Sequence, residues 1–436
     1  MELEEEIQRI GRELAEAYPT AARHPVRAID ERAMDLATRD AELRAALFRF
    51  VDVVPACRSL DDLARHLTAL LDEVDERPQP LDVAVRMADT KVGAQALGLA
   101  AVAGVLHMAH RFIVGETTAD AARLLRGLWN DGVAASVDLL GEATVTVQEA
   151  DGYAARCVEA LRTLHESSAA WPPRPGLEPR VNLSVKISAL TPLLRPEAPE
   201  VGEHDAAARL LPLMRLARDL GAHLHIDMES LDSREAVLEL VLDLLAREEL
   251  AAGPSAGLVL QAYLRDAGET LDRVLEWAAD HRRAQPLVVR LVKGAYWDHE
   301  IVEARRHGWP VPVFEDKADS DRNFETLTRR LVDARPLVRV AVASHNLRSI
   351  SHAIAYNRAS GGADQDLELQ ILRGLGDDLQ AALVSRGFRV RAYCPVGDLV
   401  AGMAYLVRRL LENTSNEGFL SAQAHGASVE ELLAAP

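Results

Sequence analysis

The spacing of apolar residues changes near residue 130. Before that point, apolar positions recur three and four residues apart, as in Leu43, Ala46 and Phe50. This is the period of an amphipathic helix, and proline residues between such stretches separate one helix from the next. The pattern predicts a helical arm and a pre-barrel helix over residues 1–130.

The longest apolar stretch, residues 92–106, lies within this arm. It contains Gln95, and Ala and Gly dominate it. A helix needs ~20 apolar residues to cross a bilayer, and this stretch is shorter. We therefore expect residues 97–112 to form a last, well-buried helix of the arm.

Beyond Gly132 the chain alternates between short runs of Val, Leu and Ile and helical stretches. Most of these runs are nearly continuous in apolar character, as in parallel strands that are buried on both faces. Eight such units predict a (β/α)8 barrel over residues 131–420, followed by a tail over residues 421–436. The predicted strands cover residues 133–139, 181–187, 222–226, 257–262, 287–292, 338–343, 367–372 and 389–393. The predicted helices include residues 205–220, 233–248, 268–281, 322–333, 347–357, 377–386 and 398–411.

A doubly wound open sheet is the structural alternative to the barrel. Such a sheet carries a glycine-rich phosphate loop after its first strand. No G-x-G-x-x-G follows the first predicted strand, and no G-x-x-x-x-G-K-[ST] occurs in the sequence. The barrel is therefore the favoured fold.

Polar residues lie at or near the ends of all eight predicted strands, where barrel enzymes carry their chemistry. A charge inside a buried strand is costly unless it is paired or faces a ligand. Each residue alone is explained by an ion pair or a helix cap, as for Ser344 and Asn346 before the next helix. As a set they suit a polar ligand that bears both signs of charge. The set comprises Asp138, Glu142, Lys186, Ser188, Asp227, Glu229, Gln261, Tyr263, Arg290, Lys293, Tyr296, Trp297, Asp298, Ser344, His345, Asn346, Gln370 and Tyr393.

The last predicted helix carries a second polar cluster. Tyr405, Arg408, Arg409 and Glu412 are spaced i, i+3, i+4 and i+7, so they share one helix face. A solvated charged face with an Arg408–Glu412 pair is the simpler explanation. However, residues 403–411 are otherwise apolar, and paired guanidinium groups are well matched to a carboxylate.

Composition excludes several classes of function. The 436 residues are 48% hydrophobic and 27% charged, and the formal net charge is −18, which argues against a nucleic-acid partner. The three cysteines are widely spaced and form no Cys-x-x-Cys pair, so neither a disulfide framework nor a structural zinc site is indicated. The acidic N-terminus does not resemble a signal peptide. A reduced cytoplasmic compartment fits these features.

Metal and serine chemistry have weaker support. His107 and His110 share a helix face but have no third ligand nearby, and His223 and His225 alternate on one strand before its end. No Gly-x-Ser-x-Gly elbow occurs. We therefore expect no metal ion.

Several longer motifs resemble the proline dehydrogenase domain of the bifunctional proline utilization A flavoenzymes. The resemblance is dense from Phe112 to about Phe419 and loose over the first ~100 residues, where the family also has a helical arm. The motifs are Phe112–Glu116, Asp138–Ala143, Ser184–Leu190, Ile226–Glu229, Gln261–Tyr263, Arg290–Asp298, Ser344–Asn346, Gln370–Gly376, Tyr393–Gly397 and Tyr405–Asn413.

The resemblance implies FAD-dependent oxidation of L-proline to Δ1-pyrroline-5-carboxylate, by hydride transfer from the ring carbon to flavin N5. It implies catalytic roles for Lys186, Asp227, Arg290 and Tyr296, with Arg290 near N5. The substrate would contact Lys186, Asp138, Tyr296, Leu372, Tyr393, Tyr405, Arg408 and Arg409. The cofactor would contact Asp227, Gln261, Arg290, Val292, Lys293, Gly294, Ala295, Trp297, Lys317, Ser344, His345, Asn346, Gln370 and Glu412.

The family further implies a quinone electron acceptor, and with it at least transient contact at the inner face of the membrane. It also implies a pyrroline-5-carboxylate dehydrogenase domain or protein as a partner. Where the family often has Thr-Arg-Lys, this chain has Glu315-Asp316-Lys317. Two other functions stay open: a flavin dehydrogenase for another cyclic imino acid such as hydroxyproline, and a non-catalytic flavin-binding scaffold.

Overall fold

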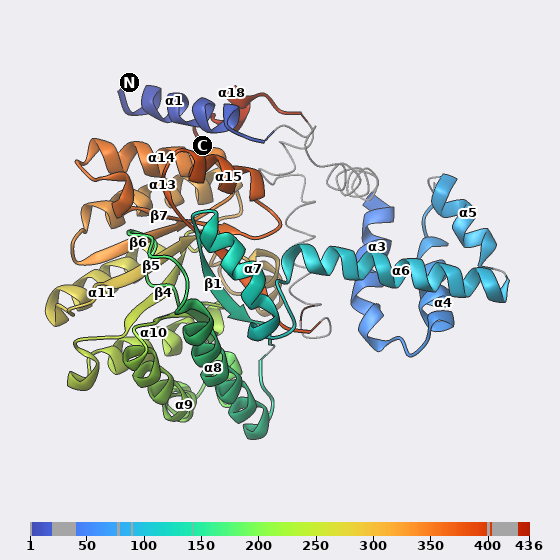
Figure 1. Ribbon diagram of the computed structural model, residues 1–436, viewed down its shortest axis with the longest axis horizontal. Helices are drawn as coiled ribbons and strands as arrows, with labels where there is room; N and C mark the ends of the chain where they lie inside the picture. The colour runs from blue at the N-terminus through green and yellow to red at the C-terminus, as the bar shows by residue number, and fades with distance from the viewer. Residues whose placement is uncertain are drawn as a thin grey trace.

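The computed structural model describes residues 2–19, 41–75, 79–88, 90–141, 143–398, 402 and 426–436. Its centre is a closed barrel of eight parallel strands in the order β1 to β8 (Figure 1), which confirms the predicted fold class. The strands are β1 Val133–Leu139, β2 Asn182–Lys186, β3 His223–Asp227, β4 Ser255–Gln261, β5 Leu287–Val292, β6 Val338–Ala343, β7 Glu368–Leu372 and β8 Arg389–Val396.

Helices surround the barrel, with one or more after each of the strands β1 to β7 and one, α7, before β1. They are α7 Thr118–Asn130, α8 Val147–Ser168, α9 Pro199–Asp219, α10 Leu231–Leu245, α11 Ala267–His281, α12 Trp297–His307, α13 Lys317–Asp333, α14 Leu347–Ala359 and α15 Asp377–Ser385. Single 3-10 turns lie at η3 Ile187–Ala189, η4 Glu248–Leu250 and η5 Asp364–Asp366. The predicted helix over residues 398–411 lies outside the described residues, apart from Asp398 and Gly402.

Several predicted boundaries moved, and two of the shifts have local reasons. Helix α13 begins at Lys317 rather than at residue 322, because the side chain of Asp316 caps it by accepting a hydrogen bond from the backbone N–H of Ala318 at 2.8 Å. Strand β8 continues to Val396, because it pairs with β1 over the whole length of β1.

Each strand alternates in character, and the two faces of the sheet differ. Outward residues such as Leu183, Val289 and Leu369 join the main apolar core between strands and helices. The inward residues between them are mostly polar, as in Ser184 and Arg290. The strands are buried on both faces as predicted, but apolar residues fill only one of them.

The N-terminal residues divide into two parts. Helices α3 Ala41–Val53, α4 Leu60–Leu71, α5 Gln79–Met87 and α6 Lys91–Phe112, with the turn η2 Val54–Ala56, have an apolar core of their own. They form an arm beside the barrel (Figure 1). Helix α1 Glu2–Glu16 instead packs on α14 and α15, where the C-terminal helix α18 Val429–Leu432 also lies. The first helix therefore belongs to the barrel's packing rather than to the arm.

The prediction that the apolar stretch forms a well-buried helix was wrong, because much of that helix is exposed. Helix α6 contacts the other arm helices along one side only, so Val92 and Leu99 remain 80% and 61% exposed. The helix has 22 residues, and among the described residues it is the one helix long and apolar enough to cross a membrane. That statement rests on length and composition alone. The core helices of many proteins pass the same test.

Gly257 offers a test of the barrel interior. A β-carbon there would lie 2.4 Å from Nδ1 of His225 and 2.7 Å from the carbonyl oxygen of Val288. Gly257→Ala should lower the free energy of unfolding by about 1–3 kcal/mol, because the added methyl group would collide with the His225 ring and with the backbone of β5. Urea denaturation of the two proteins measures the difference.

The matched control is Gly152→Ala in α8, where a β-carbon would meet nothing within 4 Å. It should raise the free energy of unfolding by roughly 0.5–1 kcal/mol, because alanine is the better helix former. Equal effects of the two substitutions would mean that the His225 ring is not held against β4.

Candidate active site

Arg290 lies inside the barrel on β5 and is 3% exposed. Its Nε donates to Oε1 of Gln370 at 2.7 Å, and its Nη1 donates to Oδ1 of Asp227 at 2.6 Å. Its Nη2 donates to the hydroxyls of Ser136 and Ser184 at 3.2 and 3.1 Å. Four strands other than β5 thus supply acceptors to one guanidinium group.

Asp227, at the end of β3, joins Arg290 to the mouth of the barrel. Its Oδ2 accepts a hydrogen bond from the Tyr393 hydroxyl at 2.7 Å and lies 3.6 Å from Nζ of Lys186. Lys186 also pairs directly with Asp138 on β1. With Gln370 included, the structure therefore brings together six predicted site residues from six different strands.

Burial and charge shift the pKa values of this cluster. Burial alone would lower the pKa of Lys186, but Asp138 and Asp227 outweigh it and raise that pKa. Burial, and then the same two carboxylates, raise the pKa of the Tyr393 hydroxyl well above its usual range. Lys186 is therefore a cation and Tyr393 a neutral hydrogen-bond donor at neutral pH.

A second cluster lies where β5 and the start of α13 meet. Lys293 and Lys317 both pair with Asp321, and Nζ of Lys317 is 2.5 Å from the carboxylate. Burial lowers the pKa of Lys293 to about 8, although Asp321 partly offsets the effect. The cluster has two amines and one carboxylate.

The segment after β5 is open to solvent next to this cluster. Gly294 and Ala295 are exposed, and Gly294 adopts a φ of 135°, a conformation that L side chains rarely adopt. A β-carbon on Gly294 would lie 2.4 Å from the ring of Tyr263. Trp297 donates from its indole N–H to the carbonyl of Phe314 at 2.8 Å, while Val292 is half-buried.

The predicted residues after β6 have local structural partners. Asn346 caps α14 by accepting from the N–H of Ser349 at 3.0 Å, and Ser344 accepts from the N–H of Asn346 at 3.1 Å. Nε2 of His345 accepts from the backbone N–H of Leu372 at 2.9 Å. Asn346 thus has the expected capping role, whereas Ser344 bonds the backbone N–H of the cap residue rather than the helix itself.

The remaining predicted site residues are placed as follows. Gln261, at the end of β4, donates from Nε2 to the carbonyl of Glu229 at 3.0 Å. Tyr296 is the N-cap residue of α12. Tyr405, Arg408, Arg409, Glu412 and Glu142 lie outside the described residues.

Comparisons with known protein families match most of the chain. Residues 121–422 match the profile of proline dehydrogenase, and residues 4–112 match that of the proline utilization A N-terminal domain. The first match includes all eight strands of the barrel. The chain belongs to the proline dehydrogenase family. Enzymes of this family are flavoenzymes.

Relatives in the family are of two lengths. The bifunctional protein PutA of Salmonella typhimurium is 33% identical over 340 residues, which cover 76% of this chain and 25% of that protein. The proline dehydrogenase of Deinococcus radiodurans is 29% identical over 315 residues, which cover 72% of this chain and 89% of that protein. The aligned part of this chain thus covers about a quarter of the full length of the bifunctional relatives.

Solved structures extend the likeness to the arm. Proline utilization A from Bdellovibrio bacteriovorus matches 99% of this chain and 44% of its own length, with a TM-score of 0.89 at 34% identity. The Bradyrhizobium japonicum protein matches 100% of this chain and 46% of its own, with a TM-score of 0.78 at 27% identity.

Several inward residues were missing from the predicted site of this family member. Ser136 and Ser184 contact Arg290, and Glu368 contacts Gln370. All three lie two residues before a predicted site residue on the same strand. Because side chains alternate along a strand, the period of two would have placed them on the inner face.

Two of the histidines considered as metal ligands, His223 and His225, are hydrogen-bonded to protein groups. His223 and His225 hydrogen bond to each other at 3.0 Å between Nε2 and Nδ1, and Nδ1 of His223 bonds the Ser255 hydroxyl at 2.8 Å. These bonds give each of the two buried rings a protein partner, while Nε2 of His225 is buried without a hydrogen-bond partner among the described residues.

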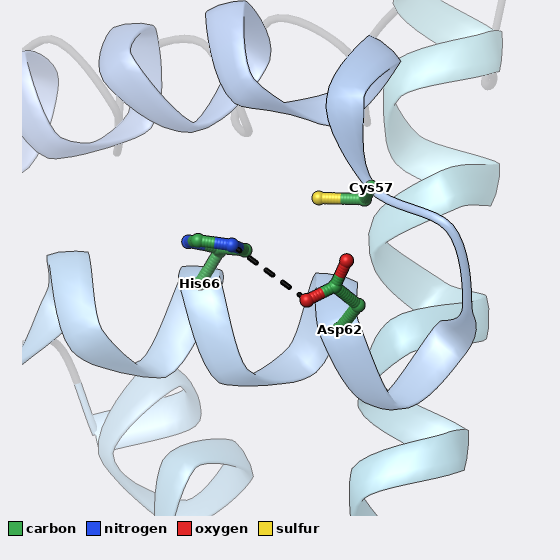
Figure 2. Close-up of side chains that lie close together, drawn as sticks. All are labelled: Cys57, Asp62 and His66. Carbon is green, nitrogen blue, oxygen red and sulfur yellow. Dashed lines mark ion pairs between the residues drawn. The ribbon is translucent and has the colours of Figure 1, made fainter.

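One mixed group of possible metal ligands occurs in the described part of the arm. Cys57, Asp62 and His66 converge with their ligand atoms within 4.8 Å of one another (Figure 2). However, the carboxylate of Asp62 already pairs with Arg65 and accepts from the backbone N–H of Arg58 at 3.1 Å. Helix capping and an ion pair account for this geometry, and we assign no metal to it.

The buried histidine His223 makes the stability of the protein depend on pH. Burial, with the charge of Arg391, lowers the pKa of His223 to about 3, whereas an unfolded chain has a histidine pKa of about 6.5. Between these values the unfolded chain binds a proton and the folded chain does not, so stability falls as the pH drops below about 6.5. His223→Gln should remove about 1.4 kcal/mol of the loss in unfolding free energy between pH 7.5 and 5.5.

Denaturation curves at the two pH values measure this effect. His165→Gln, at an exposed position of α8, is the matched control and should leave the pH dependence unchanged. If His223→Gln also leaves it unchanged, the ring is not held neutral in the barrel.

Proposed function

We propose that this chain oxidises L-proline to Δ1-pyrroline-5-carboxylate with non-covalently bound FAD, as the first step of proline catabolism. The observation that carries the proposal is the cluster of Lys186, Asp138, Asp227, Arg290 and Tyr393 at the mouth of a barrel of this family. Barrel enzymes carry their active sites at this end of the strands.

The residues after β5 and at the start of α13 fit a flavin dinucleotide. Lys293, Lys317 and Asp321 together carry one surplus positive charge, which suits a phosphate group. Gly294 keeps the backbone side of this region free of a side chain. Glu315 and Asp316, which replace the Thr-Arg often found in the family, both have partners within the protein. Asp316 caps α13, and Glu315 pairs with Arg305 at 2.7 Å. They therefore do not exclude a phosphate beside Lys317.

Bound FAD supplies the two-electron acceptor for the hydride that leaves the proline ring. Arg290 places a fixed cation inside the barrel mouth, held by Asp227 and Gln370. A cation there stabilises negative charge that develops during reduction. Tyr393, anchored by its bond to Asp227, forms a wall next to Arg290, whose guanidinium carbon lies 5.1 Å from the centre of the phenol ring.

The substrate carboxylate needs a counter-charge from outside the described cluster. Lys186 and Arg290 are balanced within it by Asp138 and Asp227. A net positive charge must therefore come from another element, and we assign this role to Arg408 and Arg409. Guanidinium groups bind a carboxylate in two-pronged geometry. Tyr296, Leu372 and Tyr405 complete the substrate pocket in this proposal, and Glu412 contacts the cofactor.

We further propose that a quinone accepts the electrons and that the product passes to a pyrroline-5-carboxylate dehydrogenase domain or protein. The relatives named bifunctional support the second partner, since this chain matches a quarter of their length. The reaction would take place in the cytoplasm, with transient contact at the inner face of the membrane.

An anaerobic absorbance spectrum tests the cofactor and the substrate together. The purified, flavin-supplemented chain should be yellow, and adding L-proline should bleach the flavin absorbance. Denaturation should release FAD. A spectrum that does not change with L-proline but bleaches with trans-4-hydroxyproline would support the alternative substrate, and no bleaching with either would support a scaffold.

Substitution of the proposed clamp separates substrate binding from cofactor binding. Arg408→Met or Arg409→Met should lower kcat/KM for proline roughly tenfold to a hundredfold, about 1.5–3 kcal/mol, with the flavin content retained. Arg306→Met, at an exposed arginine of α12, is the control and should keep wild-type kinetics. Wild-type kinetics in both clamp variants would remove these arginines from the substrate site.

A further inference from the structure

A line of hydrogen bonds runs below Arg290 toward the other end of the barrel. Oε1 of Gln370 accepts from Nε of Arg290 at 2.7 Å, and Nε2 of Gln370 donates to Oε1 of Glu368 at 2.7 Å. All three side chains are buried, with 3–6% of their surface exposed. Among the described residues, Glu368 bonds Gln370, Arg389 and Arg391 rather than residues of the barrel mouth, and Gln370 alone lies between it and Arg290.

The amide of Gln370 can face Arg290 with either of its two ends. The two ends are nearly equal in size, but one accepts hydrogen bonds and the other donates them. Nε of Arg290 is a donor and is satisfied only if the amide oxygen faces it. An ionised carboxylate accepts and never donates, so Glu368 forces the NH2 end of Gln370 toward itself and the oxygen toward Arg290.

Two arginines keep Glu368 ionised and in place. Nε of Arg391 lies 3.0 Å from Oε1 of Glu368, and Nη2 of Arg389 lies 2.9 Å from Oε2. Burial alone would raise the pKa of Glu368, but Arg391 and Arg389 outweigh it and lower that pKa well below its usual range. Arg391 is in turn tied to the backbone carbonyl of Ala135 at 2.8 Å.

We propose that Glu368 is a positioning residue, which acts through the amide of Gln370 to hold the guanidinium of Arg290 against Asp227. The inference rests on the proposed flavin-dependent oxidation, in which Arg290 provides the cation of the barrel mouth. Glu368 itself touches neither substrate nor cofactor. Without it, only Arg290 orients the amide of Gln370, and the NH2 end of that amide loses its acceptor.

Glu368→Asp tests the role while keeping the charge. The carboxylate still balances Arg389 and Arg391, but it is one methylene shorter and no longer reaches Gln370. We expect kcat for proline to fall about tenfold with little change in KM, because a displaced active-site group slows the reaction without weakening substrate binding. We also expect the flavin midpoint potential to shift to a more negative value, since the cation is less well held.

Glu325→Asp is the matched control. Glu325 is also a buried glutamate in an arginine pair, with Oε1 at 2.8 Å from Nε of Arg348, but it lies between α13 and α14 outside the barrel. Both substitutions should lower the melting temperature. Only Glu368→Asp should move the potential and kcat, and equal effects in the two variants would reduce Glu368 to a structural role.

The amide relay itself is tested in a second background. In Gln370→Met, adding Glu368→Asp should cause no further shift in potential, because the group through which Glu368 acts is gone. Additive shifts would overturn the proposal. The potentials are measured by dye-coupled redox titration without proline, so the comparison does not depend on turnover. A protein that proline fails to reduce would contradict the proposed function. The measured potentials would still decide whether Glu368 acts through Gln370.

Discussion

The interior of this barrel is organised around the buried cation of Arg290. A guanidinium group placed in the middle of a strand and closed off from water is strongly unfavourable unless its donors are satisfied and its charge is balanced. Asp227 balances the charge, and Gln370, Ser136 and Ser184 accept the remaining hydrogen bonds. The usual inner layers of branched apolar residues are replaced here by polar ones.

This constraint spreads along the barrel in both directions. Toward the mouth, Asp227 also orders Tyr393 and approaches Lys186, so one carboxylate serves three strands. Toward the other end, Gln370 leads to Glu368 and its two arginines. Charged side chains lie at both ends of this network. At the mouth their charges cancel, because Lys186 and Arg290 are balanced by Asp138 and Asp227. A ligand that brings its own carboxylate must therefore find its counter-charge on another element.

The chain termini are fastened to the outside of the same barrel. Arg348 on α14 pairs with Glu325 and with Glu4 of α1, and it donates to the carbonyl of Leu433 at 3.1 Å. Gln8 of α1 donates to the same carbonyl at 2.8 Å. The first helix and the last one thus stabilise each other, while α3 to α6 build a separate core beside them (Figure 1).

The sequence by itself determined the number, order and approximate bounds of the strands. Those features are local, because an apolar run of strand length and a helical period can be read without knowing what lies across the molecule. The sequence also predicted that the polar strand ends lie in one site, because parallel strands in a barrel end on the same side. The resemblance in its motifs named the family that the comparisons confirm.

Only the tertiary structure decided which of these polar residues face one another. Arg290 and Asp227 are 63 positions apart and Tyr393 and Asp227 are 166 apart, and closure of the barrel brings them into contact. Ser136, Ser184 and Glu368 entered the site in the same way. The exposure of α6 and the docking of α1 on α14 were likewise undecided, because an amphipathic period says that a face is buried but not against what.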